Sequence, residues 1–412
     1  MIVTNGMKKI ILILAVGVTA FVGYFFYTYK SFNLPSKATV DTGGAETKPL
    51  PFELQPGFKM SVFAKDVKNA RVMVMSPGGV MFVSQPSEGK ISALPDKDGN
   101  GVADENIAVV GGLNKPHGLA FRCLDIENPL NCKLYVGETN QLSEFDYDSK
   151  SMLATNKKKI LDLPSDGYNQ HFTRTLLFML SPNENTLLIS VGSSCNVCQE
   201  KDERRAKILS YDFVSKKSGI FSRGLRNSVF MEIHPVTGAI WATEMGRDGL
   251  GDDIPPDEIN IIEKGKNYGW PICYGENIHD GEFDKNTYIR NPCDEPFETP
   301  SHIDLQAHSS PLGLTFVPEE GWTEEYRHDL LVAYHGSWNR SVPTGYKIVR
   351  FNLDINGKYN KGIVAQDFIT GWLASDGTRI GRPVDIKAFP GGNIYISDDQ
   401  AGIIYRITNE YQ

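Results

Sequence analysis

Short apolar segments recur along most of the chain, and each is followed by a turn and a second apolar segment. In the first copy, residues 72–75 and 80–83 are apolar, and the turn Ser76-Pro77-Gly78-Gly79 separates them. Short apolar runs bounded by proline and glycine predict strands rather than helices. The same unit occurs six times, over residues 72–83, 118–136, 176–191, 230–242, 312–333 and 384–396.

A repeat of about 50 residues with two to four strands per unit is typical of a β-propeller. Because a small sheet cannot bury both of its faces alone, neighbouring units stack around an axis. Six copies therefore predict an all-β, six-bladed β-propeller with inserted loops over residues 52–412, with residues 402–407 as a last strand that helps to close the ring. A sandwich of unrelated hairpins is the alternative. The longest insertion, residues 265–305, is expected to form an irregular loop over one face.

The N-terminal segment differs from the rest of the chain. Residues 10–29 carry no charge and follow Lys8 and Lys9. Because about 17–25 apolar residues span a bilayer, residues 1–30 are predicted to be a transmembrane anchor; a cleaved signal peptide is the alternative. The polar residues 31–51 are predicted to be a linker. Either reading exports the remaining chain to the periplasm or the exterior, with membrane contact through this segment only.

The cysteines and the net charge bear on the cellular compartment and on the class of partner. The chain has six cysteines, which fit an oxidising compartment. Proximity alone suggests three local pairs, Cys123/Cys132, Cys195/Cys198 and Cys273/Cys293, although six cysteines allow fifteen pairings. A structural bridge is the preferred interpretation of the C-x-x-C at 195–198, with a redox pair or half of a zinc site as alternatives. The net charge of −8 argues against a nucleic-acid partner.

Cationic and polar residues stand at similar places in several copies of the repeat, directly before or after a strand pair. Because the loops at one end of a propeller converge on a central funnel, we expect these distant residues to meet there. The segments are 115–118, 170–174, 226–227, 246–248, 335–340 and 382–383. They supply at least four arginines and three histidines. A funnel of this composition favours an anionic ligand, since the arginine fork matches carboxylates.

A loop rich in glycine and acidic residues lies at 244–258, within the segment 224–271. Such a loop suits a hard cation such as Ca²⁺, which takes carboxylate and backbone carbonyl oxygens as ligands. A solvated acidic surface loop is the alternative interpretation. The acidic residues of this loop are interpreted as holding its shape rather than a metal: Asp252, Asp253, Asp257 and Glu258.

The residues R-N…W-A-T-E-x-G…D-D-x-P-P-D-E-I-N…K-G-x-N-Y-G-W-P between 226 and 271 resemble the signature of the soluble quinoprotein sugar dehydrogenases. These enzymes depend on pyrroloquinoline quinone (PQQ), and the sorbosone and pyranose dehydrogenase branch is the most similar. The resemblance runs from about residue 54 to residue 407. It implies a Ca²⁺-dependent oxidoreductase that oxidises a sugar by hydride transfer to PQQ. The electrons would pass to an external acceptor, a cytochrome or a quinone, because no haem-attachment motif is present.

The resemblance also implies roles for single residues. His171 falls on the catalytic base, which takes the proton of the sugar hydroxyl. Gly246 and Arg247 fall where two backbone carbonyls bind calcium, although the family has a different residue at the second position. The implied cofactor contacts are His117, Arg174, Arg226, Asn227, His335, Arg340 and Arg382. The sequence departs from glucose-type relatives in two places, since residues 335–345 form a longer segment and only one arginine stands at 381–383.

Two other functions remain open from the sequence. A calcium-dependent propeller hydrolase of the lactonase type would hold its metal with carboxylates and asparagines from several blades. A non-catalytic propeller that binds a protein or a glycan would need no cationic funnel. Because the residues at the strand ends are mostly arginine and histidine, the sequence favours the dehydrogenase.

Overall fold

The computed structural model describes residues 36–37, 52–123, 132–166, 171–358 and 364–410. The predicted anchor, residues 1–30, lies outside the described residues, as does nearly all of the predicted linker. Within the described ranges there is no helix that is both long and apolar enough to cross a membrane.

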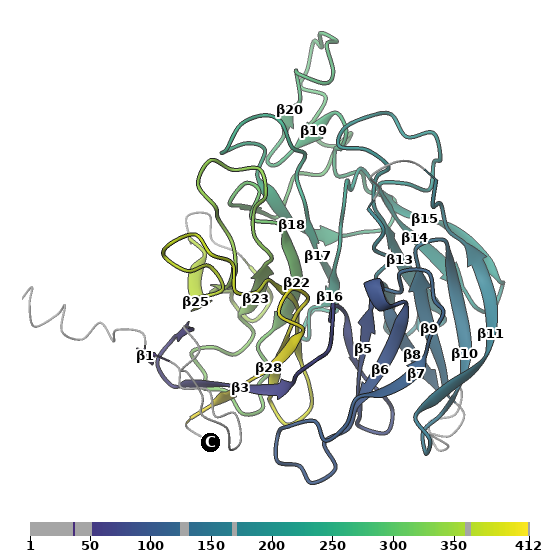
Figure 1. Cartoon of the computed structure of the whole chain (residues 1–412). Helices are drawn as coiled ribbons and strands as arrows, with labels where there is room; N and C mark the ends of the chain where they lie inside the picture. The colour runs from purple at the N-terminus through teal and green to yellow at the C-terminus, as the bar shows by residue number, and fades with distance from the viewer. Residues whose placement is uncertain (1–35, 38–51, 124–131, 167–170, 359–363, 411–412) are drawn as a thin grey trace, which may run out of the picture.

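Six antiparallel sheets surround a common axis, which confirms the predicted all-β six-bladed propeller (Figure 1). Blade 1 holds β4 (Met73–Met75), β5 (Met81–Gln85), β6 (Lys90–Leu94) and β7 (Ile107–Val110), with the short 3₁₀ turn Pro86–Glu88 after β5. Blade 2 holds β8 (Leu119–Cys123), β9 (Cys132–Glu138), β10 (Gln141–Asp148) and β11 (Leu153–Asp162). Blade 3 holds β12 (Leu176–Phe178), β13 (Thr186–Val191), β14 (Lys207–Asp212) and β15 (Lys217–Arg223).

The other three blades carry the additional strands. Blade 4 holds β16 (Met231–Ile233), β17 (Ile240–Glu244), β18 (Asp257–Ile262) and β21 (Ile303–Leu305). Blade 5 holds β22 (Pro311–Phe316), β23 (Leu330–Tyr334), β24 (Lys347–Phe351) and β25 (Gln366–Thr370), and is extended at its edge by β2 (Glu53–Leu54) and β1 (Ser36–Lys37). Blade 6 holds β26 (Pro383–Ala388), β27 (Ile394–Asp398), β28 (Ile403–Asn409) and β3 (Phe58–Ala64).

The ring is closed by strands from the two ends of the propeller sequence. As predicted, the last strand β28 takes part in the closure, and its partner is the N-terminal strand β3. The register pairs Ile407 with Met60 and Tyr405 with Val62, so β3 forms the outer edge of blade 6. Backbone hydrogen bonds between β3 and β28 thus hold the first and last parts of the propeller in one sheet.

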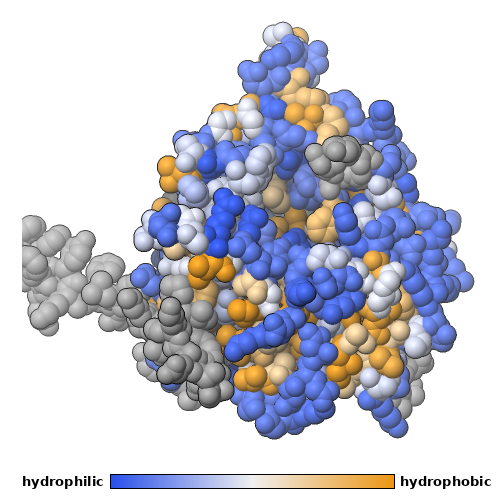
Figure 2. Space-filling model, viewed as in Figure 1, coloured by the Kyte–Doolittle hydropathy of each residue, from blue (hydrophilic) through white to orange (hydrophobic). Residues whose placement is uncertain are grey.

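The inner strands are buried on both faces because neighbouring blades cover them. Every residue of β5, β22, β23 and β27 is buried, which explains why their sequences are mostly apolar. Aromatic side chains join adjacent blades, and Trp241 of blade 4 packs edge-to-face on Phe316 of blade 5 at 5.4 Å. By contrast, the outer strand β11 is mostly exposed. Much of the surface in the view of Figure 2 is hydrophilic.

The three disulfides join the expected pairs, Cys123–Cys132, Cys195–Cys198 and Cys273–Cys293. They indicate an oxidising compartment and therefore export. The insertion at 265–305 corrects one expectation, since it is not wholly irregular. It contains the small hairpin of β19 (Cys273–Tyr274) and β20 (Ile278–His279), and its last residues form β21, the outer strand of blade 4.

Candidate functional site

The predicted site segments come from equivalent positions of successive blades. The first strand of each blade starts at one end of the axis, and the second strand returns to that end. Segments before a first strand include Arg71, His117, His171–Arg174, Arg226–Asn227 and Arg382. Segments at or after the end of a second strand include Glu138, Ser193, Glu244, His335 and Asp399. The topology therefore places these residues around one mouth.

His171 is held in a single tautomer by Ser193. Its Nδ1 lies 3.1 Å from the Ser193 carbonyl oxygen and 3.1 Å from Ser193 Oγ. The Ser193 hydroxyl donates its hydrogen to the Cys195 carbonyl at 2.6 Å, so both partners of Nδ1 act as acceptors. Nδ1 therefore carries the hydrogen, and Nε2 has a free lone pair. Burial and the charge of Arg226 lower the pKa of His171 to about 3, which keeps the ring neutral.

Gly192 separates His171 from Asn227. A Cβ atom at this position would lie 2.6 Å from His171 Cβ and 2.6 Å from Asn227 Oδ1, closer than non-bonded atoms normally approach. The glycine thus allows the histidine and the amide to stand side by side. The buried Oδ1 of Asn227 has no hydrogen-bond partner among the described residues.

The Arg226 guanidinium is buried, and all five of its N–H donors are engaged. Nε donates to the Asn196 carbonyl at 2.8 Å, and Nη2 donates to Asn196 Oδ1 at 3.0 Å and to Asp248 Oδ2 at 3.4 Å. Nη1 donates to the carbonyls of Met245 and Gly246 at 3.2 and 2.9 Å. One of the carbonyls predicted to bind calcium, that of Gly246, therefore faces Arg226.

Buried carboxylates shape the backbone around Gly246. Glu244 accepts the Asn227 N–H at 2.8 Å, and Asp257 accepts the N–H groups of Gly246 and Ser310, each at 2.9 Å. Burial raises the pKa of Asp257 to about 6 and the pKa of Glu258 to about 7, and Glu258 accepts the Gly275 N–H. In this structure these two carboxylates support the loop, in agreement with the interpretation from the sequence.

A second cluster links blades 5, 6 and 1. His335 Nε2 lies 3.1 Å from Asp399 Oδ1, and Arg71 Nη1 binds the other carboxylate oxygen at 2.9 Å. Arg382 donates to the His335 carbonyl at 3.0 Å and lies 5.6 Å from the ring centre of Tyr346. Burial lowers the pKa of His335 to about 4, although its bond to Asp399 opposes the shift.

His117 connects the two clusters at the mouth. It is fully buried, and its Nδ1 lies 3.3 Å from the Thr175 hydroxyl, which donates its own hydrogen to the Val229 carbonyl. Nε2 is therefore unprotonated, and it has no partner within the described part of the chain. Phe172 packs between His117 and Arg71, whose guanidinium lies 5.6 Å from the ring centre.

Three predicted site arginines are engaged by the protein itself. Arg174 is fully buried and donates to the carbonyls of Pro164, His171 and Thr173. Arg340 donates to the carbonyls of Asp252 and Ala307, and Arg247 binds the Asp280 carboxylate at 2.7 Å. These side chains brace the loops at the mouth, and a direct contact of Arg174 or Arg340 with a cofactor stays a prediction.

The sequence reading missed several residues of the mouth. Arg71 shortly precedes the first strand of its blade, as Arg226 and Arg382 do, so the repeat position could have identified it. Asp399 follows the second strand of blade 6 and could have been found in the same way. Ser193 and Asn196 carried no signal beyond their proximity to the C-x-x-C motif.

Taken together, the mouth suits an anionic cofactor next to a hard cation. Arg71, Arg226 and Arg382 provide positive charge, while His117 Nε2 and Asn227 Oδ1 are buried polar atoms without protein partners. The carbonyl oxygens of Met245 and Gly246 both accept hydrogen bonds from Arg226. The fold is a six-bladed propeller with cationic and polar residues gathered at one end of its axis.

Comparison with known proteins identifies the family of this chain. The family model described as TrAA12-like matches residues 52–410. The chain therefore belongs to this family of PQQ-dependent sugar and pyranose dehydrogenases. It is 32% identical over 394 residues to an uncharacterized protein of Borreliella burgdorferi, covering 95% of this chain and 98% of that one.

Two further similarities are more distant. The chain is 23% identical to the pyrroloquinoline quinone-dependent pyranose dehydrogenase of Coprinopsis cinerea, over 90% of this chain but only 56% of that protein, so it spans about half of its length. The calcium structure of a family AA12 enzyme from Trichoderma reesei superposes with a TM-score of 0.73 at 21% identity, covering 90% of this chain and all of that chain. At this identity the structural match shows the shared fold.

Proposed function

We propose that this protein is a PQQ- and Ca²⁺-dependent dehydrogenase that oxidises a hydroxyl-bearing carbon of a sugar, an aldose, a pyranose or a sorbosone-like compound. The observation that carries the proposal is the arrangement of His171. Ser193 fixes its Nδ1–H, which leaves the Nε2 lone pair free, and the histidine lies next to Asn227 at the mouth of a propeller from this family.

The chemistry of each residue at the mouth indicates which part of the ligand it would bind. Arg382 and Arg71 would hold the carboxylates of PQQ. Arg226, whose N–H donors are all engaged by the protein, would add positive charge beside the cofactor, and Asn227 and His117 would contribute polar contacts. The carbonyls of Gly246 and Arg247 would hold Ca²⁺. When bound, PQQ supplies a two-electron acceptor and Ca²⁺ polarises its reacting carbonyl.

The proton of the sugar hydroxyl goes to His171 Nε2. The Nδ1–H group donates to the Ser193 carbonyl at 3.1 Å, so the ring is oriented for this transfer and its cationic form is stabilised. Burial is the larger cause of the low pKa of His171, and the charge of Arg226 is the second. A polyanionic ligand beside Arg226 would offset this second cause and raise the pKa in the direction that favours general-base catalysis.

The alternatives receive less support from the structure. The buried carboxylates Asp257 and Glu258 accept hydrogen bonds from backbone N–H groups. A lactonase-type site would instead direct several carboxylates towards a metal on the axis. A pure binding module has no need for a histidine held in one tautomer within a cationic mouth.

We also propose that the electrons pass to an external acceptor, a cytochrome or a quinone, and that the protein acts after export.

The test is a titration of the purified protein with PQQ, with and without Ca²⁺, followed by dye reduction across a panel of aldoses. We expect Ca²⁺-dependent PQQ binding and sugar-dependent bleaching of the dye. His171→Asn should bind PQQ with similar affinity and lose turnover by at least a factor of about 100, the lower range of general-base contributions. Failure to bind PQQ, or acid release from lactones in place of dye reduction, would refute the proposal.

A further inference from the structure

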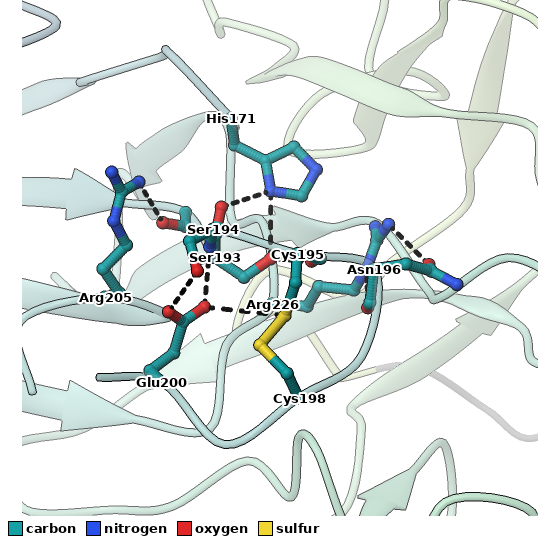
Figure 3. The surroundings of a disulfide bond; sticks show 10 residues. His171, Ser193, Ser194, Cys195, Asn196, Cys198, Glu200, Arg205 and Arg226 are labelled. Carbon is teal, nitrogen blue, oxygen red and sulfur yellow. Dashed lines mark hydrogen bonds between the residues drawn. A yellow bond between two sulfur atoms is a disulfide. The ribbon is translucent and has the colours of Figure 1, made fainter. Parts of the chain in front are cut away.

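The loop between β13 and β14 forms hydrogen bonds to the side chains of both His171 and Arg226. Within residues 193–200, the Cys195–Cys198 disulfide closes a small ring over residues 195–198 (Figure 3). Glu200 secures the other side of this loop, because its carboxylate accepts both the N–H and the hydroxyl of Ser194 at 2.6 Å. The loop is thus internally braced although it contains no regular secondary structure.

One end of this loop orients His171. Ser193 accepts the Nδ1–H of the histidine, and its hydroxyl is fixed by the carbonyl of Cys195, which is itself part of the disulfide. Ser193 also donates its own N–H to the Arg226 carbonyl at 2.7 Å. The disulfide, the histidine and the strand entry of blade 4 are therefore connected through a single serine.

The middle of the loop holds Arg226. Asn196 lies between the two cysteines, and both its carbonyl oxygen and its Oδ1 accept hydrogen bonds from the guanidinium. The same side chain exchanges two hydrogen bonds with the backbone of Asp248: it accepts the N–H at 2.8 Å and donates Nδ2 to the carbonyl at 2.9 Å. Asn196 thus joins the arginine to the loop that carries Gly246 and Arg247.

We propose that the disulfide-closed loop 193–200 is a clamp that presets His171, Arg226 and the 245–248 loop for ligand binding, and that Asn196 is its positioning residue. The disulfide restricts the backbone around Asn196. Asn196 is exposed and lies outside the strands, and the bond between Cys195 and Cys198 limits the orientations of its carbonyl and side-chain amide. This inference rests on the proposed function for the identity of the ligand.

The chain offers a matched control for the disulfide. Cys123–Cys132 joins the end of β8 to the start of β9, and His117 precedes β8, so this bridge lies at the opposite end of its blade from the mouth. The test compares Cys195→Ser/Cys198→Ser with Cys123→Ser/Cys132→Ser. We expect the first pair to weaken PQQ binding at least tenfold in absorbance titrations with Ca²⁺, and the second pair to change it less than twofold.

Two single variants test the clamp without depending on the folding of a disulfide mutant. Asn196→Ala removes all side-chain contacts to Arg226 and Asp248, whereas Asn196→Asp retains an acceptor for both and loses only the Nδ2 donor to the Asp248 carbonyl. In the cofactor-free protein we expect amide hydrogen exchange across residues 245–250 to accelerate at least fivefold in the alanine variant and to accelerate less in the aspartate variant. PQQ affinity should follow the same order.

The outcomes separate the clamp from the proposed function. Unchanged PQQ affinity and unchanged amide exchange in Asn196→Ala would overturn the clamp. An equal loss of affinity in both disulfide variants would also overturn it, since the effect would then be general destabilisation. If wild-type protein bound no PQQ but Asn196→Ala still accelerated exchange at 245–250, the clamp would stand and the proposed function would fail.

Discussion

Replacing Gly192 by alanine adds one methyl group between His171 and Asn227. The new Cβ would lie 2.6 Å from His171 Cβ and 3.1 Å from His171 Cγ, whereas carbon atoms in contact prefer about 3.5–4.0 Å. The histidine, the amide or the strand end must therefore shift by about an ångström. Overpacking of this size costs about 1–3 kcal/mol of stability, and a misplacement of about 1 Å at a reacting centre costs about 100-fold in rate.

Gly219→Ala is the matched control, because a Cβ there would approach only Ser210 Oγ, at 3.8 Å. Both variants would be followed by calorimetry for Tm, by PQQ titration and by dye reduction for kcat. We expect Gly192→Ala to lower kcat at least tenfold with a lower Tm, and Gly219→Ala to retain kcat. Wild-type kcat in Gly192→Ala would refute the reasoning, since it would show that His171 and Asn227 need not be fixed side by side.

Three further predictions follow from the charges at the mouth. Because burial lowers the pKa of His171 to about 3, the unfolded state binds its proton first, so this residue's contribution to stability is lost as the pH falls from about 6.5 towards 3; denaturant titrations should show a weaker loss in His171→Asn. Asp399→Asn breaks the charge pair with Arg71 and weakens the hydrogen bond to His335, and should lower the free energy of unfolding by about 3–5 kcal/mol in urea titrations; a loss below 1 kcal/mol would contradict the pairing. Chelation of Ca²⁺ should abolish dye reduction, and Ca²⁺ should restore it where Mg²⁺ does not, because Mg²⁺ loses its water ligands reluctantly; recovery with Mg²⁺ alone would exclude a calcium-selective loop.

The architecture was predictable because the six-fold repeat is visible as a recurrence of apolar segments along the sequence. Inner strands such as β5 and β23 are buried on both faces, so they appear as recurring segments that are mostly apolar. Outer strands carry a weaker signal. β21 is three residues long and follows an insertion, and the partner of β28 lies at the other end of the sequence, so neither pairing was visible in local patterns.

The site was predictable in location but not in side-chain geometry. His171, Arg226 and Arg382 each precede the first strand of a blade, so the topology brings them to the same end of the axis, while their roles stay a prediction. The partners of Arg174 and Arg340, in contrast, are backbone carbonyls of loops, and no sequence pattern states where a carbonyl points. The hold of Asn196 on Arg226 likewise depends on a loop conformation that a disulfide creates.

The pairing of β3 with β28 also affects how the protein is made. Residues 58–64 leave the ribosome more than 300 residues before the strand that completes their sheet, residues 403–409. Until then the nascent polypeptide exposes an unpaired strand edge, which is prone to aggregation. A polypeptide truncated before residue 403 would leave β3 unpaired and the ring open.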